Sequence, residues 1–207
     1  MAEIQLVENA KNSDIATWLC HRLDVALQSG EGPVAITVPG GSTPFPILEE
    51  LVKSPLDWSR IVVWPGDDRV VPEDHAASNT GKIRALFEPV GSEVVTLSEM
   101  EEVPHFALVW LGMGSDGHIA SLFPNTNPQT DDPQMVRRLT PDPLPPEAPF
   151  DRITLTLPAL LDSDEILFVI RGDDKFAVFD AAARGENDLP VARLLRAASS
   201  QNVACFT

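Results

Sequence analysis

The sequence predicts an α/β fold with a mostly parallel sheet that helices cover on both faces. Short apolar runs alternate along the chain with segments whose apolar residues recur at helical spacing. The runs are apolar at consecutive positions, as in strands buried on both faces of a parallel sheet. Several end in loops rich in glycine or acidic residues, at the place where ligands bind in open α/β sheets. The alternation therefore indicates the fold class, and the loops indicate where a site lies.

The first half of the chain has the clearest local signals. From Ser13, a candidate N-cap, to Gly30, a candidate C-cap, apolar residues at helical spacing predict an amphipathic helix. The β-branched run Val34–Val38 predicts a buried strand, and the glycine loop after it leads into a helix that begins near Phe45. We then expect a strand at 61–64, a helix at 78–87, a weak strand at 94–97 and a buried strand at 106–111.

A proline-rich stretch interrupts the second half. Eight prolines fall between Pro124 and Pro149, so a regular helix cannot run through most of it, and we expect a long surface loop or a lid. Ile153, Leu155 and Leu157 alternate with polar residues, as in a half-exposed strand. We then expect a buried strand at 165–170, helices at 175–184 and 190–198, and a strand at 202–206 that closes the sheet.

Length, charge and cysteine content limit the class of protein. The 207 residues suit one large domain or two small ones, and we expect a single domain over 1–207. The net charge of -16 argues against nucleic acid or an anionic membrane as partner, and a phosphorylated substrate needs either a local cluster of some of the 15 Lys and Arg residues or helix N-termini. No run suits a membrane span, and Cys20 and Cys205 form no metal motif or disulfide framework, so we expect a reduced, cytoplasmic protein.

The segment 111–124 carries the strongest functional signal. It follows the expected strand at 106–111, and its three glycines let the backbone turn sharply and approach a ligand. Asp116 and His118 stand at the end of this turn, and histidine is the side chain best suited to move protons near neutral pH. The glycines also fit a dinucleotide-binding pattern, but Pro124 leaves no room for the helix that this pattern needs. A lone histidine can equally be structural, so His118 alone leaves both interpretations open.

Two other loops follow expected strands. In the loop Gly40–Pro44, a hydroxyl residue can cap the next helix and two glycines leave N–H groups free, which predicts an anion cradle or a plain tight turn. Asp67 and Asp68 stand beside Arg69, a combination that suits an acid or base with an anion clamp. The same carboxylates could ligate a metal together with Asp74 and His75, or form a solvated surface.

Taken together, these segments resemble the 6-phosphogluconolactonases, sugar-lactone hydrolases of the pentose phosphate pathway. The similar motifs occur in order over nearly the whole chain, and they are Gly40–Pro44, Asp67–Pro72 with Ser78-Asn79, Leu111–Pro124, Arg152–Thr154 and Gly172–Lys175. The resemblance implies a three-layer Rossmann-like fold and hydrolysis of 6-phospho-D-glucono-1,5-lactone by a monomer or small homo-oligomer. It implies no metal and no cofactor.

The resemblance also assigns residues. His118 is the expected general base for the attacking water, and Asp116 or Asp67 is expected to orient its imidazole. The phosphate is expected on the glycine loop and two basic residues, with Arg69 lining the site; the residues are Gly40, Gly41, Ser42, Thr43, Arg152 and Lys175. Asp68 stands where the family usually has Glu, so its carboxylate is one methylene shorter.

Two alternatives have different sequence requirements. The related glucosamine-6-phosphate deaminases show D-E-Y and G-H-I-A-F-N-E-P where this chain has Asp67–Arg69 and Gly117–Pro124, so the sequence favours a lactonase. A non-catalytic sugar-phosphate sensor of the same fold would carry a DNA-binding segment, for which the chain has neither a spare stretch nor the positive charge.

Overall fold

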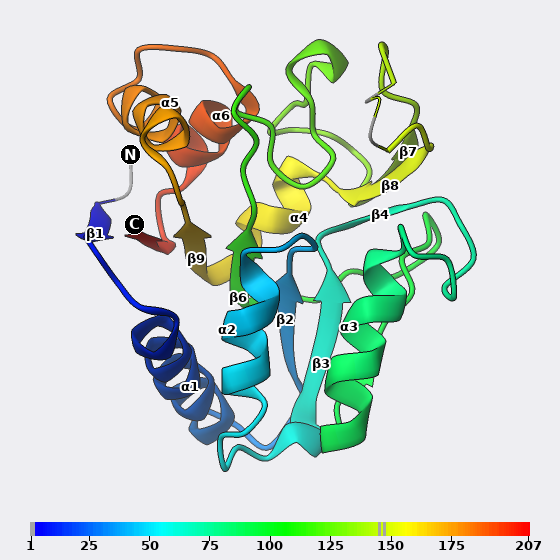
Figure 1. The fold of residues 1–207 in the computed structure, drawn as a ribbon, viewed down its shortest axis with the longest axis vertical. Coiled ribbons are helices and arrows are strands. Elements are labelled where there is room, and N and C mark those ends of the chain that lie inside the picture. The colour runs from blue at the N-terminus through cyan, green and yellow to red at the C-terminus, as the bar shows by residue number, and fades with distance from the viewer. Residues whose placement is uncertain (1–2, 145, 147) are drawn as a thin grey trace.

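The main sheet consists entirely of parallel strands, which confirms the predicted α/β class (Figure 1). A computed structural model describes residues 3–144, 146 and 148–207, and in them this sheet has seven strands in the order β1-β10-β9-β6-β2-β3-β5. The strands are β1 (Ile4–Val7), β2 (Val34–Val38), β3 (Ile61–Pro65), β5 (Glu93–Val94), β6 (Phe106–Leu111), β9 (Ser163–Val169) and β10 (Asn202–Phe206). No helix in this described part is long and apolar enough to cross a membrane.

Helices pack on both faces of the sheet and make three layers. One face carries α1 (Asn12–Gln28), α2 (Pro44–Leu51) and α3 (Asn79–Phe87), and the other carries α4 (Leu157–Leu161), α5 (Asp173–Ala183) and α6 (Pro190–Ala197). Successive strand residues point to opposite faces: Ile36 belongs to the first core and Ala35 to the second. Both faces are covered, so β2 is buried at all five positions, and only Thr37 among them is polar. The short 3-10 helices are Trp58–Arg60, Glu88–Val90 and Pro124–Thr126.

A small antiparallel sheet lies beside the main one and supplies part of the site. It consists of β4 (Asp67–Arg69), β8 (Arg152–Leu155) and β7 (Val136–Leu139), in the order β4-β8-β7. In its register Asp67 pairs with Thr154, and Arg69 pairs with Arg152. The sheet therefore brings Asp67–Arg69 of the acidic loop next to the motif Arg152–Thr154, although the two segments are far apart in sequence.

Two expectations for this region were wrong. The proline-rich stretch 124–149 is not entirely a loop, because it contains β7, which pairs along its length with β8; residues 145 and 147 of the stretch lie outside the described part. The strand after it is not half-exposed: its polar residues Arg152 and Thr154 are buried as well as Leu155. The alternation of polar and apolar residues in this strand therefore reflects two buried environments: Leu155 lies in the apolar core, and Arg152 lies at a polar cavity.

Several element boundaries also differ from the expectation. Helix α1 begins after Lys11 rather than at a Ser13 cap, and Asp14 accepts a hydrogen bond from the Lys11 N–H at 3.0 Å. The helix ends at Gln28, before Gly30, and the weak strand at 94–97 shortens to β5. The strand β1 was not expected; it pairs with β10, so β10 is not the edge of the sheet. Such short strands depend on their partners rather than on their own residues.

An ion cluster joins β6 and β9 at the edge where these strands begin. His105 stands before β6, and its Nδ1 lies 2.7 Å from Asp162 Oδ1 while its Nε2 lies 3.1 Å from Asp164 Oδ1. The hydrogen bond to Asp162 raises the pKa of His105 above its ordinary value of 6.5, burial opposes this, and Asp164 adds to it. Protonated His105 therefore stabilises the start of the two strands.

The raised pKa predicts a stability contribution that depends on pH. The contribution should be complete below the unfolded pKa, near 6.5, and should disappear as the pH rises through the higher folded pKa. Because the cluster is half exposed, His105→Ala should lower the free energy of unfolding by at most about 1 kcal/mol at about pH 5.5, and by almost nothing at about pH 9. Urea unfolding at both pH values checks this, and equal losses at both would contradict it.

Candidate functional site

A cavity of about 430 Å³ lies where β2, β3, β6 and β9 end. Its walls include nearly all the residues that the sequence singled out: Gly40, Gly41, Ser42, Thr43, Asp67, Arg69, His118, Arg152 and Lys175. Asp116 reaches the site through its contact with His118. Four further residues line the cavity without a site role predicted from sequence: Asn79, Ser121, Phe123 and Arg171. The first three belong to recognised motifs, which was the signal available for them.

The glycine loop follows β2 and leads into α2. Pro44 is the first helical residue, one position before the expected start near Phe45, and Thr43 stands at the N-cap position. Its side chain makes no capping hydrogen bond within the described residues, so the expected hydroxyl cap is not formed. Gly41 adopts a φ of 100°, which favours glycine, and a Cβ on Gly40 would lie 2.0 Å from Asn79 Oδ1. Glycine is therefore required both for the turn and for the close approach of α3.

The buried carboxylate of Asp68 connects β4 to the start of α3. Its oxygens accept hydrogen bonds from the N–H groups of Arg69, Asn79 and Thr80 at 2.7, 2.6 and 2.9 Å, and from the Ser78 hydroxyl at 3.1 Å. Asn79 and Thr80 open the helix, so a negative charge here also complements the helix dipole. Asp68 is thus a structural anchor, and the shorter aspartate side chain fits this close position.

Asp67 takes part in a second set of polar contacts. Ser121 Oγ donates to Asp67 Oδ2 at 2.5 Å, and Asn79 Nδ2 donates to the Asp67 carbonyl at 3.0 Å. Burial raises the pKa of the Asp67 carboxyl, although the Ser121 hydrogen bond and the charge of Arg69 lower it in part. Asp67 was one of two candidates for orienting His118, but its contacts are with Ser121 and Asn79.

The carboxylate of Asp116 contacts both the imidazole and the backbone of His118. The carboxylate Oδ1 lies 2.6 Å from His118 Nδ1 and accepts the backbone N–H of the same residue at 3.2 Å. Burial alone would raise the pKa of Asp116, but the charge and hydrogen bonds of His118 outweigh burial and lower this pKa. An ionised Asp116 favours the tautomer with a proton on Nδ1, so Nε2 can accept a proton.

The surroundings of His118 limit where its ring can lie. A Cβ on Gly114 would lie 2.2 Å from His118 Cε1, so the ring rests directly on this glycine. The centroid of the Phe123 ring lies 4.7 Å from that of the imidazole. The glycines of this loop therefore provide space for the imidazole, and the loop positions one basic nitrogen at the cavity.

Basic residues reach the cavity from two regions. Arg69 and Arg152 come from paired strands: Arg69 Nη1 donates to the Ala77 carbonyl at 3.0 Å, and Arg152 donates to the Phe150 and Ala148 carbonyls at 2.5 and 2.8 Å. Burial, followed by the charge of Arg69, lowers the pKa of Arg152. Lys175 comes from the first turn of α5 and is exposed, and Arg171 precedes that helix.

The possible metal ligands in the acidic loop have other contacts. His75 Nδ1 accepts the Ala77 N–H at 3.0 Å, and its ring packs edge-on against Phe150. Asp74 is exposed, and both oxygens of Asp68 already accept hydrogen bonds. Across the described part of the chain, no three or more His, Cys, Asp or Glu residues are grouped so that they could hold a metal ion.

The chain is similar to known proteins over nearly its whole length. The family model for glucosamine-6-phosphate isomerases/6-phosphogluconolactonase matches residues 8–94 and 85–204. A 6-phosphogluconolactonase of Pseudomonas aeruginosa is 38% identical over 88% of this chain and 86% of its own length. One of Neisseria meningitidis serogroup B is 33% identical over 96% and 94%.

Solved structures show the same fold. The structure of 6-phosphogluconolactonase from Thermotoga maritima aligns with a TM-score of 0.81 at 23% identity, covering 100% of this chain and 99% of that one. A 6-phosphogluconolactonase from Shewanella baltica aligns with the same TM-score at 23% identity, covering 99% and 97%.

The contacts of Asp68 predict a large effect on stability. Asp68→Ala removes the acceptor of three N–H groups and one hydroxyl in a buried place, so the free energy of unfolding should fall by about 2–4 kcal/mol. The exposed Asp74 of the same loop provides a control, and Asp74→Ala should change stability by less than about 0.5 kcal/mol. Urea unfolding measures both, and equal effects would show that Asp68 is not an anchor.

Proposed function

The chain belongs to the glucosamine-6-phosphate isomerase/6-phosphogluconolactonase family, and we propose that it hydrolyses 6-phospho-D-glucono-1,5-lactone to 6-phosphogluconate in the oxidative pentose phosphate pathway. The observation that carries this proposal is the His118–Asp116 pair in a cavity that basic residues and a glycine loop also line. Identity above 30% with 6-phosphogluconolactonases over most of the chain supports the lactone as substrate.

His118 acts as the general base in this proposal. Nε2 takes a proton from water as the water oxygen attacks the lactone carbonyl, and a tetrahedral intermediate forms. The bond between the former carbonyl carbon and the ring oxygen then breaks, and the imidazolium returns the proton to that oxygen. Asp116 favours the correct tautomer and stabilises the imidazolium, which is consistent with its contact to Nδ1.

The 6-phosphate binds to the glycine loop and to basic side chains. Gly40 to Thr43 offer backbone N–H groups at the start of α2, and the helix dipole favours an anion there. Lys175 supplies an exposed positive charge, while Arg69 and Arg152 are held in place by the carbonyl oxygens of the loop residues Ala77 and Ala148. A local group of cations lets a phosphorylated substrate bind to a protein of net charge -16.

We also propose that this enzyme works in the cytoplasm and binds no nucleic acid. The free cysteines Cys20 and Cys205 support a reducing compartment. The strong negative charge of the chain supports the absence of nucleic acid among its partners.

The base assignment predicts the behaviour of a His118 variant. His118→Asn should lower kcat about 10²–10⁴-fold, because general base catalysis is lost while the loop keeps its shape. The assay follows proton release from freshly prepared lactone at constant pH, with the spontaneous rate subtracted. His21→Asn, on the exposed side of α1, is the control and should keep wild-type kcat. Near wild-type turnover in folded His118→Asn would remove His118 from this position in the mechanism.

The phosphate assignment predicts a difference between two substrates. Lys175→Ala should raise KM for the phosphorylated lactone about tenfold, because a charge-assisted contact is lost, and should hardly change kcat/KM for unphosphorylated gluconolactone. Lys82→Ala, which removes an exposed lysine from α3, is the matched control for net charge. Equal losses on both lactones would contradict a phosphate contact at Lys175.

A further inference from the structure

The start of α6 packs against the loop that carries His118. Gly117 precedes the histidine with a φ of 77°, and its carbonyl accepts the Val191 N–H at 3.2 Å. A Cβ on Gly117 would lie 2.7 Å from Leu189 Cδ1, so the leucine side chain touches the glycine backbone. One side of the His118 loop therefore rests on α6 and the residue before it.

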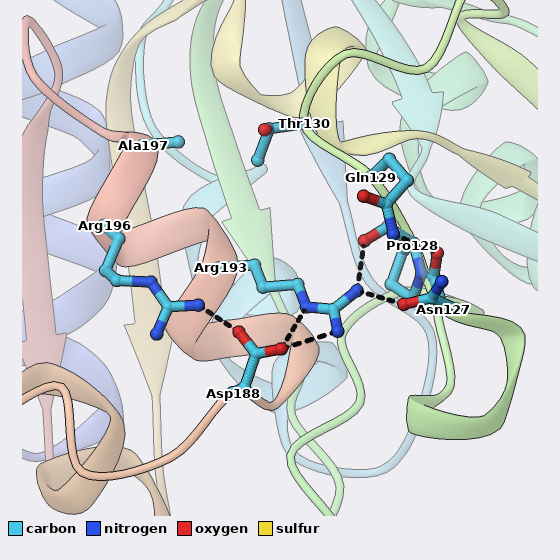
Figure 2. Close-up of a pocket in the computed structure, with 8 residues that line it drawn as sticks. All are labelled: Asn127, Pro128, Gln129, Thr130, Asp188, Arg193, Arg196 and Ala197. Atoms are coloured by element: carbon cyan, nitrogen blue, oxygen red, sulfur yellow. Dashed lines mark hydrogen bonds and ion pairs between the residues drawn. The ribbon is translucent and has the colours of Figure 1, made fainter.

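Arg193 connects α6 to the segment that follows the loop (Figure 2). Its Nε and Nη2 donate to Asp188 Oδ2 at 3.2 and 2.7 Å. Its Nη1 donates to Asn127 Oδ1 at 2.7 Å and to the Pro128 carbonyl at 2.8 Å. Arg196 donates to the second oxygen of Asp188. One guanidinium thus joins the residues before α6 to a segment more than 60 positions away.

The segment held by Arg193 leads directly to the aromatic ring beside His118. The Phe123 carbonyl accepts two hydrogen bonds from Thr126, one from its N–H at 3.0 Å and one from its hydroxyl at 2.8 Å. Asn127 then ends this short 3-10 turn with a φ of 48°. Because the turn is closed by its own hydrogen bonds, fixing Asn127 also fixes Phe123, whose ring packs at 4.7 Å from the imidazole.

We propose that Arg193 is a positioning residue for the lactone hydrolysis proposed above. Through Asp188 and Leu189 it supports Gly117, which precedes His118, and through Asn127 it supports Phe123, whose ring packs against the imidazole. By holding both neighbours of His118, it keeps the imidazole in contact with Asp116 while Nε2 faces the substrate. The inference rests on the proposed function for the identity of the reaction.

The chemistry of the contacts explains why an arginine is needed. A guanidinium is planar and can bind a carboxylate with one edge while another nitrogen reaches carbonyl oxygens, whereas a lysine ammonium is a point charge. Hydrogen bonds from Arg193 and then Arg196 lower the pKa of Asp188, which keeps its carboxylate ionised. The Arg193 side chain is 21% exposed, so its contacts are better shielded than those of Arg184, whose side chain is 56% exposed.

The cavity beside Arg193 does not turn it into a ligand site. This cavity of about 590 Å³ is lined by both arginines and by the segment Asn127–Thr130. All three nitrogens of the Arg193 guanidinium group already donate to protein oxygens. The hydrogen-bonding capacity of this side chain is used to hold the segment in place.

The test compares three single variants of the full chain. Arg193→Ala removes the contacts that this side chain makes with Asp188, Asn127 and Pro128. Arg193→Lys keeps the positive charge but lacks the planar guanidinium, and Arg184→Ala is the matched control. Arg184 stands at the end of α5 and also binds two carboxylates, those of Asp180 and Glu186. Each variant is assayed for kcat and KM, and the histidine ring protons are observed by NMR. The chain has 4 histidines, so His118→Asn identifies the signal of His118.

Both Arg193 variants should lower kcat about 10- to 100-fold with little change in KM, since a small displacement of a catalytic group has effects of that size. They should also shift or broaden the His118 Cε1–H signal and leave the other three histidine signals in place. Arg184→Ala should leave kcat and all four signals unchanged. A folded Arg193→Ala protein with wild-type kcat, with a change in KM alone, or with an unmoved His118 signal would overturn the proposal.

If Arg193→Ala does not fold, Asp188→Asn replaces it, because this variant weakens the ion pair but keeps the contacts of Arg193 to Asn127 and Pro128. A lower kcat with a shifted His118 signal then supports the proposal, and wild-type values of both overturn it. If the wild-type protein does not hydrolyse the lactone, the proposed function fails, and the His118 signal alone then decides whether Arg193 positions the imidazole.

Discussion

The carboxyl ends of parallel strands all lie at the same edge of a sheet. This constraint determines which loops can contribute residues to the candidate site. The glycine loop, the acidic loop, the His118 loop and the residues before α5 follow β2, β3, β6 and β9. These segments are far apart in sequence, yet each begins where a strand leaves the core. An antiparallel arrangement of the same strands would place half of the loops at the opposite edge. The common direction of the strands therefore collects His118, Asp116, Arg69 and Lys175 around one cavity, to which the antiparallel sheet adds Arg152.

The common edge brings the loops close, and buried polar contacts then fix them relative to one another. Asp68 holds α3 to β4, Asn79 holds Asp67, and Ser121 joins Asp67 to the His118 loop. Each of these groups would be costly to bury without a partner, so a change in one loop is resisted by the others. The contacts of Arg193 with Asp188 and Asn127 add the same kind of constraint to the segments next to the His118 loop.

Much of the fold and of the site could be predicted, for identifiable physical reasons. The strands β2 and β6 lie where predicted, since apolar runs buried on both sides need no long-range information. The predicted loops also line the cavity. They could be recognised because their glycine, carboxylate and histidine residues stand directly after predicted strands. The strand β7 was not predicted, because its identity as a strand comes from β8 and not from its own residues.

Choices that depend on tertiary contacts were also beyond the sequence. It left Asp116 and Asp67 as alternatives for the imidazole, and only their distances separate them: one contacts Nδ1, while the other contacts Ser121. Asp68 was noted as a shortened carboxylate, but its function as the anchor of α3 depends on the position of four donors. No sequence pattern marked Arg193, because two of its partners, Asn127 and Pro128, come from a distant loop.

The pairing of β1 with β10 also limits the order in which the strands of the sheet can pair during synthesis. Ile4 pairs with Val203, and the Thr207 N–H donates to the Val7 carbonyl at 3.0 Å, so the first strand has its partner near the other end of the chain (Figure 1). A ribosome releases β1 early and β10 last. During synthesis β1 therefore remains without its partner until nearly the whole chain has emerged, while β2, β3 and β6 can already associate. This edge of the sheet can therefore be completed only after β10 has been made, and contacts between segments so far apart in sequence generally form slowly.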